Sequence, residues 1–137
     1  MQIRRTLGLV MAGATLASTW LVAGATSASA AGPCGAGYAR VGVYAINGDV
    51  KRHGTIEVYY NAGNGKNCAL TYGYGSFANA ENYKTAKIRP SGGSTDNDHG
   101  WFKYYAGPVY AKAPSKCIDV YGAVGGAGRW LRGVHCG

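Results

Sequence analysis

Short runs in which apolar and polar residues alternate follow one another along the chain after residue 30. The clearest is Thr55–Tyr60, where Ile56, Val58 and Tyr60 share one parity. Alternation with a period of two places every second side chain on the same face of a β-strand. Apolar residues do not recur at the spacing of an amphipathic helix over any useful length. The pattern therefore predicts an all-β chain built from short strands.

Turn signals between these runs divide the chain into about eight short strands. Asn47-Gly48 is a strong signal for a two-residue hairpin, from which Asp49–Arg52 would return. The other expected strands are Tyr38–Ile46, Thr55–Tyr60, Cys68–Tyr74, Ala86–Arg89, Trp101–Tyr105, Val109–Lys112, Cys117–Tyr121 and Arg129–Cys136. Regular turns between short strands favour a small antiparallel sandwich or barrel.

The sequence also predicts the local structure of three further segments. Phe77–Thr85 is the candidate for a helical turn, Ser91–Gly100 is expected as a polar loop, and Ala106–Pro108 as a bend or bulge. In the strand that precedes the first of them, alternation puts Cys68 and Leu70 together on the inward face.

The first thirty residues have the composition of a secretory signal peptide. Arg4 and Arg5 are followed by an apolar run over residues 7–24 and by Ala28-Ser29-Ala30, a small-x-small cleavage site. A retained membrane anchor is the alternative, and the arginine pair leaves a twin-arginine export route open. The expected organisation is a signal peptide over residues 1–30 and a single β domain over residues 31–137.

All four cysteines, Cys34, Cys68, Cys117 and Cys136, lie after this segment. An even number in an exported chain indicates two disulfides, whereas a zinc site would call for a Cys-x-x-Cys pair that the sequence lacks. Three pairings are possible. We expect Cys34–Cys68 and Cys117–Cys136, because each closes one local unit.

The chain is basic, with a net charge of +8 that becomes +6 when Arg4 and Arg5 are removed with the leader. Such a balance favours anionic partners, namely teichoic-type polymers, nucleic acid or anionic lipid. The alternative is that the charge only keeps a small secreted protein soluble. The basic residues are scattered, and Lys51-Arg52-His53 is the one place where they adjoin.

Candidate catalytic residues are few. Ser76 lies in GYGSFAN, which is not the Gly-x-Ser-x-Gly turn of a serine hydrolase. A secreted nuclease could use Glu57 as base, Arg89 as phosphate clamp and His99 or His135 as acid. Glu57 falls on an outward strand face, however, where a solvated charge is the ordinary explanation. We therefore expect no enzymatic activity and no catalytic residue.

The stretch Asp96–Gly100 resembles part of a calcium-binding loop. It lacks the third carboxylate and the distant glutamate of such a loop, so a hydrophilic loop tip is the expected role. No other pattern of ligands is present. We expect neither a metal nor a cofactor.

Strand parity also predicts one ion pair. Asp119 shares the parity of Cys117, and Arg132 shares the parity of Cys136. If these cysteines pair across antiparallel strands, Asp119 and Arg132 would form an ion pair stacked on Tyr121, with a structural role.

Aromatic residues are the remaining candidates for recognition, since exposed rings on a sheet bind sugars or single strands. Most must serve the core, because Leu70 and Leu131 are the two leucines left after residue 30. In the predicted strand from residue 101, alternation separates Trp101, Lys103 and Tyr105 from their neighbours. These three are the candidate ligand-contact face.

Several short motifs resemble a known family. They are CGAGY at residues 34–38, GNGKNCALT at 63–71, WFKYYAGPVY at 101–110, KCIDVYGAVG at 116–125 and GVHCG at 133–137. In this order they resemble the spore-associated protein A group, small secreted proteins of spore-forming actinobacteria. The resemblance implies export and association with spores or aerial hyphae. It implies no established enzymatic activity and supplies no catalytic residues.

Together these observations predict a secreted, non-enzymatic protein on the spore or aerial-hypha surface, either structural or in contact with the wall. The alternatives are a glycan- or polyanion-binding β module, or a small secreted inhibitor or antimicrobial effector. Expected partners are anionic cell-wall or spore-coat polymers. A specific nucleic acid and an integral membrane segment after cleavage are not expected.

Overall fold

The alternating runs become eight strands in the computed structural model, which describes residues 31–137. The elements are β1 (Ala39–Asn47), β2 (Arg52–Asn61), β3 (Lys66–Gly73), the 3-10 turn η1 (Gly75–Phe77), β4 (Asn82–Pro90), β5 (Asp96–Phe102), β6 (Tyr105–Lys112), β7 (Ile118–Val124) and β8 (Ala127–Val134). The all-β prediction is confirmed. The predicted signal peptide lies outside the described residues.

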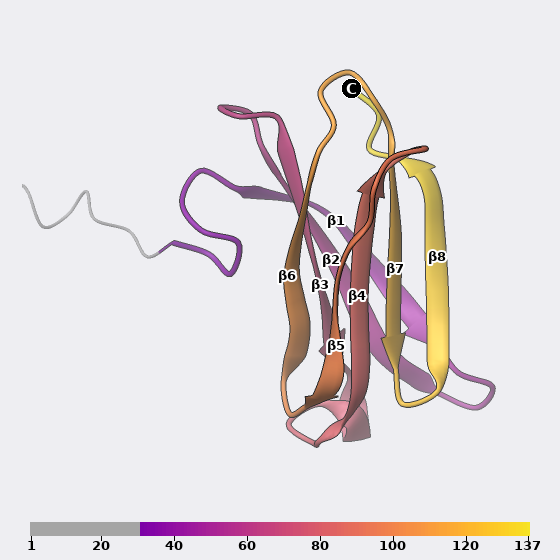
Figure 1. Cartoon of the computed structure of the whole chain (residues 1–137). Helices are drawn as coiled ribbons and strands as arrows, with labels where there is room; N and C mark the ends of the chain where they lie inside the picture. Colours follow the sequence, from indigo (N-terminus) through magenta and orange to yellow (C-terminus); the bar gives the residue numbers. More distant parts are fainter. Residues whose placement is uncertain (1–30) are drawn as a thin grey trace, which may run out of the picture. The chain divides into compact units, whose positions relative to one another are not determined.

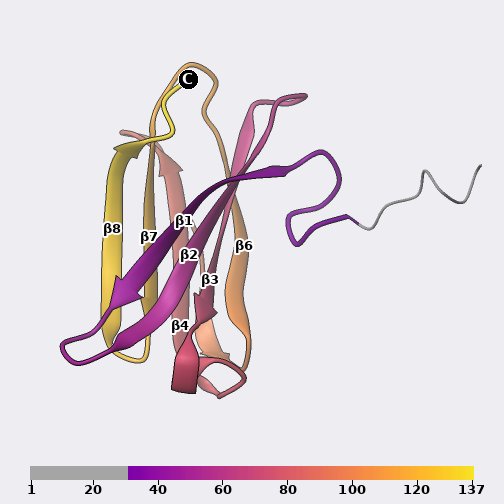
Figure 2. The ribbon, with the colours of Figure 1, turned by 180° about the vertical axis from the view of Figure 1, so that it is seen from behind.

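The strands form two antiparallel four-stranded sheets, with the orders β1-β2-β3-β6 and β5-β4-β7-β8. The two sheets face each other as the layers of a sandwich (Figure 1). Seen from behind, β1 and β2 run diagonally across β7 and β8 (Figure 2). The structure is thus the sandwich of the two architectures that the sequence allowed.

The main core lies between the sheets and is built from isoleucine, valine and alanine. Ile56 and Val58 from β2 meet Ile88 from β4 and Val120 from β7, and all four are buried. Full burial of one such side chain stabilises the fold by about 1.5–3 kcal/mol. These branched side chains fill the space that leucine fills in most small domains.

A second, smaller core lies on the other face of the first sheet. On β3, Ala69 packs into the main core, whereas Cys68 and Leu70 are buried with Cys34 in this second cluster. Cys68 and Leu70 are buried, as predicted for the inward face, but they lie in this second cluster rather than between the sheets. Both faces of β3 are buried, and alternation alone does not distinguish two buried faces.

Both predicted disulfides, Cys34–Cys68 and Cys117–Cys136, are confirmed. The first ties the segment before β1 to β3, and the second ties the start of β7 to the end of the chain. Closing chain segments of 34 and 19 residues should each stabilise the fold by about 3–4 kcal/mol.

Two predictions about the middle of the chain are wrong. The expected helical turn Phe77–Thr85 is instead η1, which ends at Phe77, followed by β4 from Asn82. The expected loop Ser91–Gly100 contains most of β5. Asp96 and Asp98 share the core-facing parity of β5, and their carboxylates accept hydrogen bonds from backbone N–H groups of β6 at 2.9 and 2.8 Å. Polar residues therefore suit this edge strand.

The prediction that Trp101–Tyr105 is one strand is also wrong, because β5 ends at Phe102 and β6 begins at Tyr105. The bend expected at Ala106–Pro108 is present inside β6, where the β3–β6 register shifts. Gly107 has a φ of +104°, and a Cβ there would lie 2.8 Å from a β3 carbonyl oxygen. Glycine suits both constraints.

The first hairpin differs slightly from the prediction. β1 ends at Asn47, one residue beyond the predicted end, and β2 begins only at Arg52, so the connection is longer than two residues. The N–H of Gly48 donates to the carbonyl of Lys51 at 2.8 Å. Along β1, the register against β2 shifts between Arg40 and Gly42, which marks a β-bulge.

Within residues 31–137, no helix has the length and apolar character that crossing a membrane requires.

Candidate functional site

The outer face of the β5-β4-β7-β8 sheet carries a cluster of aromatic and basic side chains. Cross-strand register places Trp101 beside Tyr83, and Lys87 beside Tyr121, which in turn lies beside Trp130. Directly opposed residues of neighbouring strands project from the same face of a sheet. The intervening residues of β4 and β7, including Ile88 and Val120, point into the core. We call this surface the aromatic–basic face; its residues are Tyr83, Lys87, His99, Trp101, Tyr121, Trp130 and Arg132.

One group of rings on this face lies over β4 and β5. The Tyr83 and Trp101 rings meet edge to face, with centroids 5.6 Å apart. The Tyr83 hydroxyl and His99 Nδ1 are 2.7 Å apart, within hydrogen-bonding distance. These contacts fix Tyr83 and leave Trp101 67% exposed.

The second group lies over β7 and β8 and includes two cations. The Tyr121 and Trp130 rings are 4.9 Å apart at their centroids. Arg132 lies over Trp130, with the guanidinium carbon 4.3 Å from the ring centroid, and Lys87 Nζ lies 5.5 Å from the centroid of Tyr121. Such cation–π contacts orient long side chains and stabilise by about 0.5–1 kcal/mol at exposed sites.

The predicted ion pair between Asp119 and Arg132 is wrong. Asp119 Oδ2 accepts a hydrogen bond from Arg89 Nε at 2.9 Å, while Oδ1 accepts from the Ser91 hydroxyl and from the Gly133 N–H. The β7–β8 register shifts beside Asp119, and the shift turns the Gly133 N–H rather than the Arg132 side chain toward the carboxylate.

These hydrogen bonds stabilise the ionised form of Asp119. The Gly133 N–H is the largest influence, and together with Arg89 and Ser91 it lowers the pKa of the carboxyl below its ordinary value, against the opposing effect of burial. Asp119 is therefore a buried anion that its own neighbours satisfy. Arg132 remains beside Trp130.

The three residues predicted as a ligand-contact face do not lie together. Trp101 is in β5, on the aromatic–basic face. Tyr105 is in β6 of the other sheet, where its ring packs against Tyr72 at 5.4 Å. Lys103 lies in the turn between them, with Nζ 5.5 Å from the ring centroid of Tyr104. Whether any of the three contacts a ligand stays a prediction.

The sequence alone does not show that Trp130, Tyr121 and Lys87 belong to one surface. The residues come from three strands, and only cross-strand register shows that they share a face. One local signal was available, since Trp130 and Arg132 are two residues apart and therefore share strand parity.

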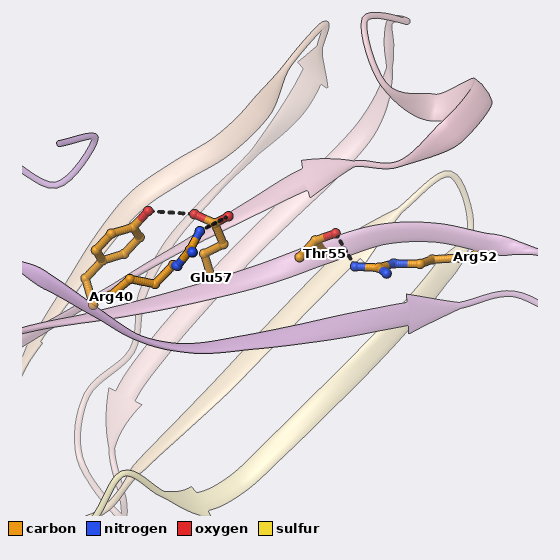
Figure 3. Close-up of polar contacts among 5 residues, drawn as sticks. Arg40, Arg52, Thr55 and Glu57 are labelled. Carbon is orange, nitrogen blue, oxygen red and sulfur yellow. Dashed lines mark hydrogen bonds and ion pairs between the residues drawn. The ribbon is translucent and has the colours of Figure 1, made fainter.

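The outer face of the other sheet holds Glu57 in a small polar network (Figure 3). Glu57 accepts a 2.6 Å hydrogen bond from the Tyr59 hydroxyl and lies 3.4 Å from Arg40 Nη1. Nearby on β2, Arg52 Nη2 donates to the Thr55 hydroxyl at 2.7 Å. Burial, followed by the bond to Glu57, raises the pKa of Tyr59 to about 12.

The residues considered for nuclease chemistry are spread over the molecule. Glu57 lies on the outer face of one sheet, whereas Arg89 and His99 lie on the outer face of the other. His135 is at the end of the chain, with Nε2 2.6 Å from the Tyr44 hydroxyl, and burial lowers its pKa. The structure does not bring these four together.

Lys84 is the most unusual buried side chain. It is 0% exposed, and Nζ donates to Asn82 Oδ1 and to the carbonyls of Ala80, Phe102 and Lys103 at 2.7–3.4 Å. Burial lowers the pKa of the amine, against the opposing effect of Glu81. The side chain joins the start of β4 to the β5–β6 turn, so it positions the strand that carries Trp101.

No group of three or more His, Cys, Asp or Glu side chains in residues 31–137 is arranged to hold a metal ion. The Asp96 and Asp98 carboxylates, which suggested calcium, accept backbone hydrogen bonds instead.

The chain is similar to spore-associated protein A from Streptomyces coelicolor. The two sequences are 35% identical over 130 residues, in an alignment that covers 91% of this chain and 80% of the relative. No protein-family model matches the chain. No solved structure matches it either. The similarity therefore extends over most of both chains rather than over one shared motif.

Proposed function

Because the chain belongs to the spore-associated protein A family, we propose that it is a secreted, non-enzymatic protein that associates with the spore or aerial-hypha surface. In this role it is held on the surface by anionic polymers of the wall or spore coat. The observation that carries the proposal is the similarity over most of both chains to a protein named for its association with spores.

The charge of the chain supports the proposed attachment. After residue 30, 12 Lys and Arg stand against 6 Asp and Glu. Among the acids, Asp119 and Glu57 are neutralised by Arg89 and Arg40, and these are the ion pairs that residues 31–137 contain. Most of the cations are thus available to an anionic polymer, which attracts them more weakly as salt rises.

The two disulfides of the domain support a location outside the cell. Disulfides persist in oxidising compartments, and this domain has two of them. Each closes a segment of the chain, which restricts the unfolded state and stabilises a small sandwich. A protein exposed on a surface benefits from such stability.

A retention assay tests the proposal. Tagged protein would be expressed in a sporulating actinobacterium, and spores and aerial hyphae would be washed with increasing salt. We expect the protein in the surface fraction at low salt and its release as ionic strength rises. Recovery in the culture medium alone, or in the cytoplasm, would contradict surface association. Release that does not depend on salt would contradict the role of charge.

A further inference from the structure

We propose that the aromatic–basic face binds an anionic polysaccharide, whose sugar rings pack on Trp101 and Trp130 and whose carboxylates pair with Lys87 and Arg132. The inference rests on the proposed function, because it names the partner and the surface that would account for attachment.

Exposure is the first observation. Trp101 and Trp130 are the two tryptophans of residues 31–137, and both lie on this face, 67% and 41% exposed. Tyr83 beside Trp101 is 42% exposed. Tryptophan has the largest apolar side chain and gains most from burial, so two exposed tryptophans on one face of a domain point to a surface that something else covers.

Charge is the second observation, and it indicates the sign of the ligand. Lys87 and Arg132 lie against the rings of Tyr121 and Trp130 and form no ion pair with a carboxylate among the described residues. The acid that β7 contributes to this face, Asp119, is 6% exposed and bonded to Arg89. An anionic group would therefore meet two cations and no competing carboxylate on these strands.

The pairing of each cation with a ring distinguishes an acidic sugar from a nucleic acid. In a uronic acid the carboxylate is attached to the sugar ring, whose C–H face packs on an aromatic side chain. The 4.3 Å contact between Arg132 and Trp130 provides a cation and a ring at that short separation. In a nucleotide, the ribose separates the phosphate from the base, so the charge and the stacking ring lie farther apart than this cation and ring do.

The distance across the face favours a polymer over a single sugar. Trp101 is on β5 and Trp130 on β8, at opposite edges of the sheet. Three strand spacings across the sheet and four residues along it place these positions about 20 Å apart. One sugar cannot reach both tryptophans, whereas an extended chain crosses both groups of rings.

The binding test uses residues 31–137 with both disulfides formed and four defined probes. Polygalacturonate is the anionic polysaccharide, pullulan the neutral one, poly-L-glutamate the anionic polymer without sugar, and an oligothymidylate the single-stranded nucleic acid. We expect polygalacturonate to bind about tenfold more tightly than each of the others at physiological salt. Equal binding of polyglutamate would show attraction by charge alone, and tighter binding of the oligonucleotide would show a nucleic-acid surface. Either result overturns the proposal.

Substitutions test the face itself. Trp101→Ala and Trp130→Ala should each weaken polygalacturonate binding about tenfold. Arg132→Met, which keeps the length of the stem, should weaken it about fivefold. Tyr105→Ala is the matched control, because Tyr105 is 41% exposed but lies on the other sheet. Unchanged binding in the tryptophan variants, or an equal loss in Tyr105→Ala, contradicts the assignment.

A folding control and a cell assay separate the two proposals. Trp101→Phe and Trp130→Phe keep a ring and should retain most of the binding, and thermal unfolding reports whether each variant is folded. If the doubly substituted Trp101→Ala/Trp130→Ala protein stays on spores as well as the wild type, the face is not the attachment site although surface association stands. If the wild type itself is absent from the spore surface, the proposed function fails whatever the probes show.

Discussion

Arg89 on β4 and Asp119 on β7 are direct cross-strand partners, and Arg89 Nε donates to Asp119 Oδ2 at 2.9 Å. The pair connects the two central strands of the second sheet at one end of the aromatic–basic face. Because Arg89 satisfies Asp119, the Arg132 guanidinium is left to lie over Trp130. The register between β4 and β7 therefore pairs Arg89 with a carboxylate and leaves the charge of Arg132 without one.

Asp119→Asn should lower the free energy of unfolding by about 2–3 kcal/mol at neutral pH. The amide keeps the shape of the side chain but loses the charge that Arg89, Ser91 and the Gly133 N–H bind. Chemical denaturation measures the loss. Asp49→Asn, in the exposed turn between β1 and β2, is the control and should change stability little.

The same variant should show a defined pH dependence. The pKa of Asp119 is lower in the folded protein than its ordinary value of 3.8, so the stabilisation is complete above that value. As pH falls below it, the unfolded chain takes up a proton before the folded one, and the wild type loses stability until the folded pKa is passed. The difference between wild type and Asp119→Asn should shrink over that window. A constant difference down to low pH would contradict the assigned role.

Lys84→Met should destabilise the domain by about 3 kcal/mol. Methionine fills a similar volume but leaves Asn82 Oδ1 and the carbonyls of Ala80 and Phe102 without their donor. Thermal unfolding gives the loss, and amide hydrogen exchange should show reduced protection in the β5–β6 turn. Lys112→Met, at an exposed position of β6, is the matched control. Equal effects of the two substitutions would mean that the buried amine has no special role.

Tyr59 should ionise at about pH 12, later than an ordinary tyrosine. Absorbance titration of the phenolates measures this, and Tyr59→Phe identifies the group. Glu57→Gln should lower the pKa of Tyr59 without restoring the ordinary value of 10.0, because burial is the largest cause of the shift. The folded pKa is the higher one, so stability should fall as pH rises from 10.0 toward 12. An unchanged pKa in Glu57→Gln would contradict the contact in Figure 3.

Much of the fold could be predicted because local pattern decides it. Alternation located β2 through Ile56 and Val58, and the even cysteine count with local closure predicted both disulfides. The edge strand β5 was missed because its core-facing positions are Asp96 and Asp98. Their partners are backbone groups of β6, and a contact with a distant strand leaves no trace in the local pattern.

The candidate site was harder to predict than the fold for a related reason. Trp101 stood out by itself, but its association with Tyr83, and that of Tyr121 with Lys87 and Trp130, depend on register among four strands. Parity predicts the face of a residue within its own strand. It does not predict which strands are neighbours or where their register shifts, and both decided that Asp119 meets Arg89 rather than Arg132.

The free edge of β1 bears on how copies of the chain behave when they meet at high local concentration. An uninterrupted edge strand offers its unpaired N–H and C=O groups to a second copy and so promotes sheet growth from molecule to molecule. The bulge between Arg40 and Gly42 bends this edge. In addition, Arg129 Nη1 of β8 donates a hydrogen bond to the carbonyl oxygen of Ala45 at 2.9 Å. Both features shorten the stretch of β1 that a second copy could extend, so this edge resists the growth of sheets from molecule to molecule.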